Sequence, residues 1–131
     1  FIHECKQLAS QGVPMPRWWL VKDDDTFVNI DRLMALAANY DPNRRVLLAK
    51  KAVSSRYNNF SNWTLQGGAG WLASAAMAEA LVLEHGDQWL MWQEACDIEY
   101  DQCMPVILDQ VHDAEIVDVG GAVFASPVKY W

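Results

Sequence analysis

The sequence predicts an α/β fold, a class in which strands alternate with helices around one core. Residues 17–21 and 46–49 each contain a short apolar run, the pattern of a buried strand. Between the two runs, apolar residues recur at helical spacing. One face of this expected helix carries Ile30, Leu33, Met34, Ala37 and Tyr40.

The remaining elements of the first half follow from local signals. Residues 1–11 fit the end of a helix, which Gly12 and two nearby prolines terminate. We expect Asn29 or Asp31 to cap the helix that follows the first strand. Residues 50–62 lack periodicity and predict a loop, and residues 63–66 predict a short strand.

The second half alternates in the same way. A helix is expected over residues 74–83, with Gly86 as its stop signal, whereas residues 88–94 are ambiguous. A further helix should begin within a few residues after Tyr100, because Pro105 is tolerated only in a first turn. Residues 116–117 and 123–124 predict a small hairpin. Only two strands are convincing before residue 67, too few for a complete doubly wound sheet.

Composition excludes some functions. The 131 residues suffice for one domain with a core, and a net charge of −7 argues against a nucleic-acid surface. There is no apolar run long enough to cross a bilayer and no recognisable signal peptide. Because the chain opens without Met, we expect it to be an excised part of a longer protein.

Cysteines and sequons bear on the compartment. Cys96 and Cys103 are candidates for a disulfide in an oxidising compartment, with Cys5 left over; three buried thiols are the alternative. Sequons begin at Asn59 and Asn62 and favour a secretory-pathway protein.

Three consecutive carboxylates, Asp23, Asp24 and Asp25, follow the first apolar run. Adjacent carboxylates repel one another, and placing them at the end of a buried strand is costly without a compensating cation. Oxygen ligands suit Mg²⁺ or Mn²⁺, which commonly bridge to substrate phosphates. The triplet therefore predicts a metal–diphosphate site, with a solvated acidic turn as the alternative.

A glycine-rich loop, Gly67-Gly68-Ala69-Gly70, stands between an expected strand and an expected helix. Such a loop lets the backbone approach a ligand closely, although a plain tight turn has the same composition. The loop and the Asp triplet both fall where α/β sheets bind ligands. A third acidic group, among Asp97, Glu99 and Asp101, lies at an expected helix start. It could act as a general base or merely cap the helix.

These motifs, taken in order, resemble the Fringe-like β-1,3-glycosyltransferases. The resemblance rests on residues 19–28 (WLVKDDDTFV), the helix after them, residues 40–42 (YDP), the strand at 46–49 and the glycine loop at 67–70. It is clear from about Arg17 to Trp71 and weaker to about Phe124. It implies a GT-A fold, a Rossmann-like nucleotide-sugar transferase architecture. Residues 1–131 would form a single partial domain, namely the C-terminal half to two-thirds of a GT-A domain. The region of the catalytic base would be residues 97–104.

The resemblance also implies an activity. The protein would be an inverting β-1,3-glycosyltransferase that uses Mn²⁺ to move a hexose or N-acetylhexosamine from a UDP-sugar to a glycan or glycoprotein hydroxyl. It would work in the Golgi or ER lumen, as a type II membrane protein whose anchor lies outside this chain.

The resemblance assigns roles to single residues. Asp25 would bind the metal, and Asp23 and Asp24 would contact the ribose and the diphosphate–metal unit, with Asp23 as a second metal ligand. The donor-sugar and acceptor pocket would be lined by Gly67, Gly68, Ala69 and Gly70. Trp71 is a candidate for stacking on a sugar, and core packing is its alternative role.

Two departures from the family pattern leave alternatives open. The family's base aligns best with Asp101, and in another register with Glu99. The family usually has a metal-binding His after a Phe near the end of the domain, and Ala125 follows Phe124 here. A catalytically inactive GT-A relative, acting as a carbohydrate-binding or partner subunit, is therefore the alternative function. A third hypothesis is a Mg²⁺ phosphohydrolase with Asp23 as nucleophile, but Phe27 stands where that pattern has Thr or Val.

Overall fold

The fold centres on a mixed four-stranded sheet with strand order β1-β6-β3-β7. The computed structural model describes residues 1–53, 63–66, 69–95, 100–120 and 123–125. Strand β6 runs antiparallel to both β1 and β3, whereas β7 runs parallel to β3. The predicted α/β class is therefore confirmed. The sheet is formed by β1 (Trp18–Val21), β6 (Trp71–Ser74), β3 (Val46–Ala49) and β7 (Glu115–Asp118).

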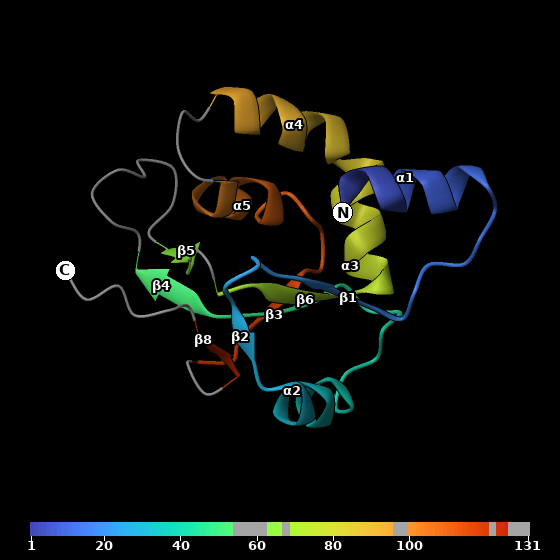
Figure 1. The fold of residues 1–131 in the computed structure, drawn as a ribbon. Helices are drawn as coiled ribbons and strands as arrows, with labels where there is room; N and C mark the ends of the chain where they lie inside the picture. Colours follow the sequence, from blue (N-terminus) through green and yellow to red (C-terminus); the bar gives the residue numbers. More distant parts are fainter. Residues whose placement is uncertain (54–62, 67–68, 96–99, 121–122, 126–131) are drawn as a thin grey trace.

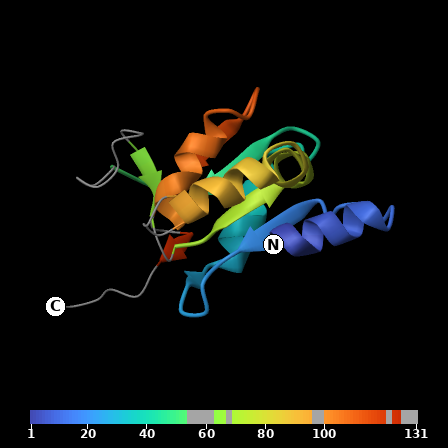
Figure 2. The ribbon, with the colours of Figure 1, turned by 90° about the horizontal axis from the view of Figure 1, so that it is seen from above.

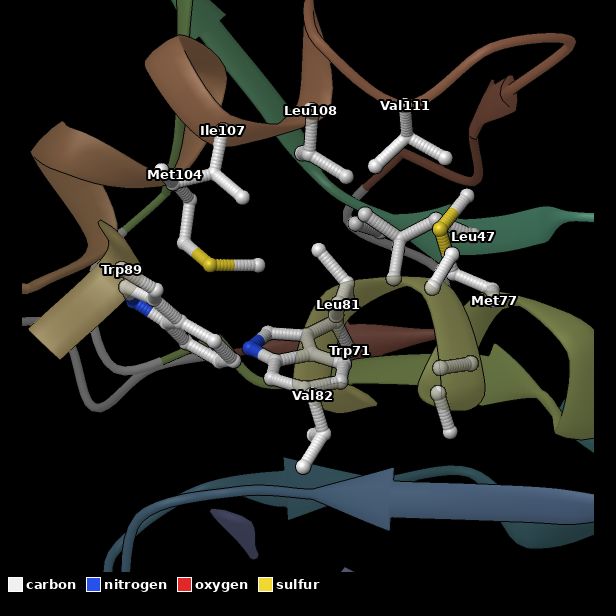
Figure 3. Close-up of a cluster of buried hydrophobic side chains, with 14 of the residues drawn as sticks. Leu47, Trp71, Met77, Leu81, Val82, Trp89, Met104, Ile107, Leu108 and Val111 are labelled. Atoms are coloured by element: carbon white, nitrogen blue, oxygen red, sulfur yellow. The ribbon is translucent and has the colours of Figure 1, made fainter. Parts of the chain in front are cut away.

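The upper face of the sheet, as seen in Figure 1, carries most of the helices. These are α1 (Ile2–Ser10), α3 (Ala75–Glu79), the π-helix η1 (Ala80–Glu84), α4 (Gly86–Ala95) and α5 (Tyr100–Leu108). Together with the upper face they bury the upper cluster, part of which is shown in Figure 3. Its members are Cys5, Leu47, Ala49, Leu65, Trp71, Ala73, Met77, Ala78, Ala80, Leu81, Val82, Trp89, Met104, Ile107, Leu108 and Val111.

The lower face is covered by helix α2 (Ile30–Ala37) and by a two-stranded sheet of β2 (Phe27–Val28) and β8 (Phe124–Ala125) (Figure 1). The lower cluster consists of Leu33, Ala37, Val46, Leu48, Ala69, Leu72, Val123 and Phe124. Alternate residues of β3 enter the two clusters, so all of its side chains are buried. This two-sided burial explains why the β3 sequence is apolar without interruption.

A third small sheet joins β4 (Lys51–Val53) to β5 (Trp63–Leu65) in antiparallel fashion. Because β4 follows β3 after the single residue Lys50, the chain leaves the main sheet at that corner and continues directly into the small sheet. Helix α5 packs against β5. The predicted loop over residues 50–62 is therefore partly wrong, since β4 occupies its beginning; residues 54–62, with both sequons, lie outside the described residues.

Several local predictions are confirmed. Helix α1 ends before Gly12, and β5 forms as expected. The Asn29 side chain accepts a hydrogen bond from the Arg32 amide at 3.1 Å, so Asn29 is the cap of α2. In the turn after α2, the Asp41 carboxylate accepts from the Asn43 amide at 2.9 Å.

Other predictions need correction. The hairpin over residues 116–124 does not form, because β7 pairs with β3 and β8 pairs with β2. Gly86 begins α4 instead of only ending the preceding helix, and the ambiguous residues 88–94 belong to α4. The expected apolar face of α2 is only half buried, since Ile30 and Met34 are 51% and 54% exposed.

Two further corrections concern strands and Pro105. The described residues before the glycine loop contain five strands, where two were convincing from sequence. Pro105 is the sixth residue of α5, beyond the first turn, and lies fully buried. Among the described residues, no helix has the length and apolar character needed to cross a membrane.

Candidate functional site

The Asp triplet forms a closed turn between β1 and β2. The Thr26 amide donates to the Asp23 carbonyl at 3.2 Å, and the Asp23 amide donates to the Thr26 hydroxyl at 3.1 Å. Thr26 is buried, and this reciprocal pair of bonds therefore fixes the backbone of the turn. In Figure 2 the turn projects from the body of the molecule. Asp24 and Asp25 are exposed, and Asp23 is half-buried.

The strand that leads into the turn is not the buried strand expected from sequence. Strand β1 lies at the edge of the sheet, and Leu20 is 38% exposed. The carboxylates after it are largely in water, so folding does not require a cation to offset their burial. The electrostatic argument for a metal is weaker than the sequence suggested.

The Asp turn could still bind a cation, because its carboxylates are not neutralised by neighbouring cationic side chains among the described residues. Within the described part of the chain, the three carboxylates make no ion pair, and the Lys22 ammonium donates instead to the Asp23 carbonyl at 2.9 Å. The described residues also contain no group of three His, Cys, Asp or Glu side chains placed to hold a metal ion. The triplet thus fits a cation that takes one or two carboxylates and completes its shell with phosphate oxygens and water.

Gly70 brings the glycine loop against the Asp turn. Its φ is +77°, and a Cβ built there would lie 2.8 Å from the Val21 carbonyl oxygen and 3.1 Å from the Lys22 Cβ. Only glycine tolerates both this backbone conformation and this close approach. Gly70, the last residue of the glycine loop, therefore lies beside the residues that lead into the Asp triplet, although the two segments are far apart in sequence. Gly67 and Gly68 lie outside the described residues, and Ala69 is buried in the lower cluster.

The meeting point lies at one edge of the main sheet. Val21, Trp71 and Ala49 are paired across β1, β6 and β3, and Asp118 of β7 continues the row. The carboxyl ends of β1, β3 and β7 thus meet the amino end of β6. The loop enters a strand and not the helix expected from sequence, because β6 precedes α3.

Sequence reasoning missed two lysines and one aspartate at this edge. Lys22 follows β1 and Lys50 follows β3, on either side of the strand that Gly70 enters. Asp118 ends β7 at the same level. The signal that could have found them is their position directly at or after an apolar strand, which becomes informative only once the strand order is known.

Trp71 is a core residue. It is 2% exposed, and its ring meets that of Phe1 edge-on with centroids 5.2 Å apart. Figure 3 shows it between Leu81, Val82 and Trp89 in the upper cluster. This position favours core packing over the stacking on a sugar that was considered from sequence.

The expected base region is only partly described. Asp101 is the second residue of α5, near the helix N-terminus as predicted, while Asp97 and Glu99 lie outside the described residues. Figure 1 shows α5 beginning on the side of the molecule where β1 leads into β2. The choice between Asp101 and Glu99 as base stays a prediction.

The segment with Phe124 and Ala125 returns to the Asp turn. Strand β8 pairs with β2, and Ala125 lies opposite Phe27, two residues after Asp25. Phe124 is fully buried in the lower cluster and holds β8 in place. The position at which the resemblance expects a histidine is therefore close in the fold to the triplet, and here it carries a methyl group.

A comparison with protein families agrees with this arrangement. The profile described as Fringe-like matches residues 2–121, which is most of the chain. The chain belongs to the Fringe-like family. Membership indicates a fold of GT-A type and, in general terms, glycosyltransferase activity. A search of curated proteins found no match. The phosphohydrolase hypothesis has no support from these findings.

Proposed function

We propose that this Fringe-like protein is an inverting β-1,3-glycosyltransferase that moves a hexose or N-acetylhexosamine from a UDP-sugar to a glycan or glycoprotein hydroxyl. The observation that carries the proposal is the contact of Gly70 with Val21 and Lys22, directly before the Asp triplet. A carboxylate turn and a close-approach glycine at one sheet edge suit a ligand with both a metal-chelating diphosphate and a sugar.

The donor side of the proposed site is the Asp turn. Asp25, with Asp23, would hold Mn²⁺, and Asp24 would contact the diphosphate–metal unit. When bound, the metal supplies Lewis-acid stabilisation of the negative charge on the departing UDP. Lys22 and Lys50 flank the same edge, and we propose that their ammonium groups add positive charge for the diphosphate.

The acceptor side of the proposed site needs a carboxylate base. Asp101, or Glu99 in the other register, would take the proton of the acceptor hydroxyl as its oxygen attacks the anomeric carbon opposite the UDP. A carboxylate in the first turn of a helix is kept ionised by the helix dipole, which keeps it able to accept a proton but lowers its basicity. We place this activity in the Golgi or ER lumen.

The test is a calorimetric titration of UDP into the full-length protein with and without Mn²⁺. We expect binding that requires Mn²⁺, is lost in Asp25→Ala and is retained in Asp109→Ala. Asp109 is an exposed acid at the end of α5 and serves as the matched control. Transfer from a panel of UDP-sugars should then fall at least a hundredfold in Asp25→Ala, a loss typical for removal of a group that stabilises transition-state charge.

A second candidate function follows from Ala125. Because the residue paired with Phe27 is an alanine, which has no metal-binding atom in its side chain, we propose as the alternative a catalytically inactive relative that binds carbohydrate or stabilises a partner. Absence of UDP binding under every metal condition would favour that function. Saturable turnover of any UDP-sugar by the full-length protein would eliminate it.

A further inference from the structure

Asp118 ties two parts of the site edge together. It is the last residue of β7, and its Oδ1 accepts hydrogen bonds from the Lys51 amide at 3.2 Å and the Gly120 amide at 3.0 Å. The Val119 amide donates to the Ala49 carbonyl at 3.1 Å, which extends the contact between the two chain segments by one residue. The carboxylate therefore spans the corner at which the chain leaves β3 and enters β4.

The β3–β4 corner is hydrogen-bonded to the residue that follows β5, the strand before the glycine loop. The Gln66 amide, directly after β5, donates to the Lys50 carbonyl at 2.9 Å, and the Ala69 amide donates to the Gln66 carbonyl at 3.1 Å. Gly70 then lies against Val21 and Lys22 at the start of the Asp turn. A continuous series of contacts thus runs from Asp118 through the corner to Gly70.

The charge of Asp118 is not explained by an ion pair. Its side chain forms none within the described residues, and it is exposed. Within the described residues, both hydrogen bonds of this carboxylate are accepted from backbone amides. These two hydrogen bonds require an acceptor oxygen at this position, but they do not require a negative charge.

We propose that Asp118 is a positioning residue: it holds the β3–β4 corner, and through Gln66 and Ala69 it sets the place of Gly70 relative to the Asp turn. Its effect on sugar transfer rests on the proposed glycosyltransferase function. Its effect on the backbone does not. Misplacement of a site segment by about 1 Å can reduce turnover by about a hundredfold, so a loosened corner should be visible in kinetics.

The experiment compares Asp118→Ala with Asp118→Asn in the full-length protein, with Asp109→Ala as control. Asparagine keeps an acceptor oxygen at the same position, whereas alanine removes it. We expect kcat to fall about tenfold in Asp118→Ala and to stay within about twofold of the parent in Asp118→Asn. Amide hydrogen exchange at Gln66 and Ala69 should become faster only in Asp118→Ala.

Three results would overturn the proposal. Equal losses in the alanine and asparagine variants would mean that the charge itself acts on the metal or substrate. A lower thermal midpoint without any change in kcat would mean that Asp118 only stabilises the fold. Unchanged amide hydrogen exchange at Gln66 and Ala69 in Asp118→Ala would rule out the positioning role. Because this measurement does not need sugar transfer, its result is distinguishable from failure of the proposed function.

Discussion

Trp71 and Asp25 lie at the same edge of the sheet, but the fold treats the two segments that carry them in opposite ways. Trp71 is 2% exposed, and Gly70 before it leaves no room for a side chain. Asp25 is exposed on a turn whose carboxylates have no ion pair within the described residues. Packing accounts for the identities of Gly70 and Trp71, whereas nothing in the packing accounts for Asp25. The contrast separates residues whose identity packing explains from a residue for which we propose a bound ligand.

The largest effect should come from Trp71→Ala. Removing a buried indole from the upper cluster should reduce the free energy of unfolding by about 3–5 kcal/mol. Trp71→Phe should cost less, because it keeps an aromatic ring and removes an indole N–H that has no hydrogen-bond partner among the residues that the structure describes. Urea unfolding of both variants measures this. A folded Trp71→Ala protein of parental stability, with only a raised KM for donor or acceptor, would show that Trp71 binds sugar and would break the contrast.

Gly70→Ala should cause the next largest loss in the free energy of unfolding. A left-handed backbone conformation at a non-glycine residue, together with a Cβ 2.8 Å from the Val21 oxygen, should cost roughly 2–4 kcal/mol. Gly12→Ala is the matched control, since Gly12 has a φ of +66° but nothing within 4 Å of its added Cβ. It should cost only about 1 kcal/mol. Equal losses in the two variants would mean that Gly70 is required for its conformation and not for its approach to the Asp turn.

The sequence predicted best those features that depend on neighbours along the chain. Strand β3 was recognisable because burial on both faces demands an uninterrupted apolar run. The cap at Asn29 follows from the chemistry of one side chain and an amide three residues away. From sequence, both the Asp triplet and the glycine loop were expected beyond the carboxyl ends of strands. Gly70 does lie beside Val21 and Lys22, but it does so at the amino end of β6.

Features that depend on distant partners could not be predicted from local patterns. Strand β1 has the same apolar character as β3, yet it lies at the edge of the sheet, and only the strand order determines its exposure. The segments at 116–117 and 123–124 carry the turn signals of a hairpin, but each finds a better partner far away in sequence. Asp118 and Lys50 belong to no motif. Lys50 lies near the site because β3 pairs with β6, and Asp118 lies there because β7 pairs with β3.

The pH dependence of stability should report on the buried Cys5 thiol, which belongs to the packed core. Cys5 is fully buried in the upper cluster, and its burial raises the pKa of the thiol from 9.0 to about 11. Below pH 9 the thiol is protonated in both the folded and the unfolded chain, so it contributes no pH dependence. Between pH 9 and 11 only the unfolded chain ionises. Stability should therefore fall with rising pH in this window, by on the order of 2 kcal/mol.

Urea unfolding of the parent and of Cys5→Ala from pH 7 to pH 11 isolates this contribution. The packing lost in Cys5→Ala should lower its free energy of unfolding, relative to the parent, by an amount that does not itself depend on pH. The gap between the two proteins should then narrow above pH 9, since only the parent has a thiol to ionise. A gap that stays constant up to pH 11 would show that the Cys5 thiol is not shielded from water.

The smallest effect on stability should come from Asp25→Asn. The side chain is exposed, and neutralising it relieves repulsion from Asp23 and Asp24, so the free energy of unfolding should change by no more than about 0.5 kcal/mol. Any gain at low salt should disappear near 1 M salt, where the Debye length is only about 3 Å. The same variant should lose Mn²⁺-dependent UDP binding. A substantial loss of stability without loss of UDP binding would assign the triplet to the fold, and Asp25 would then belong with Gly70 and Trp71.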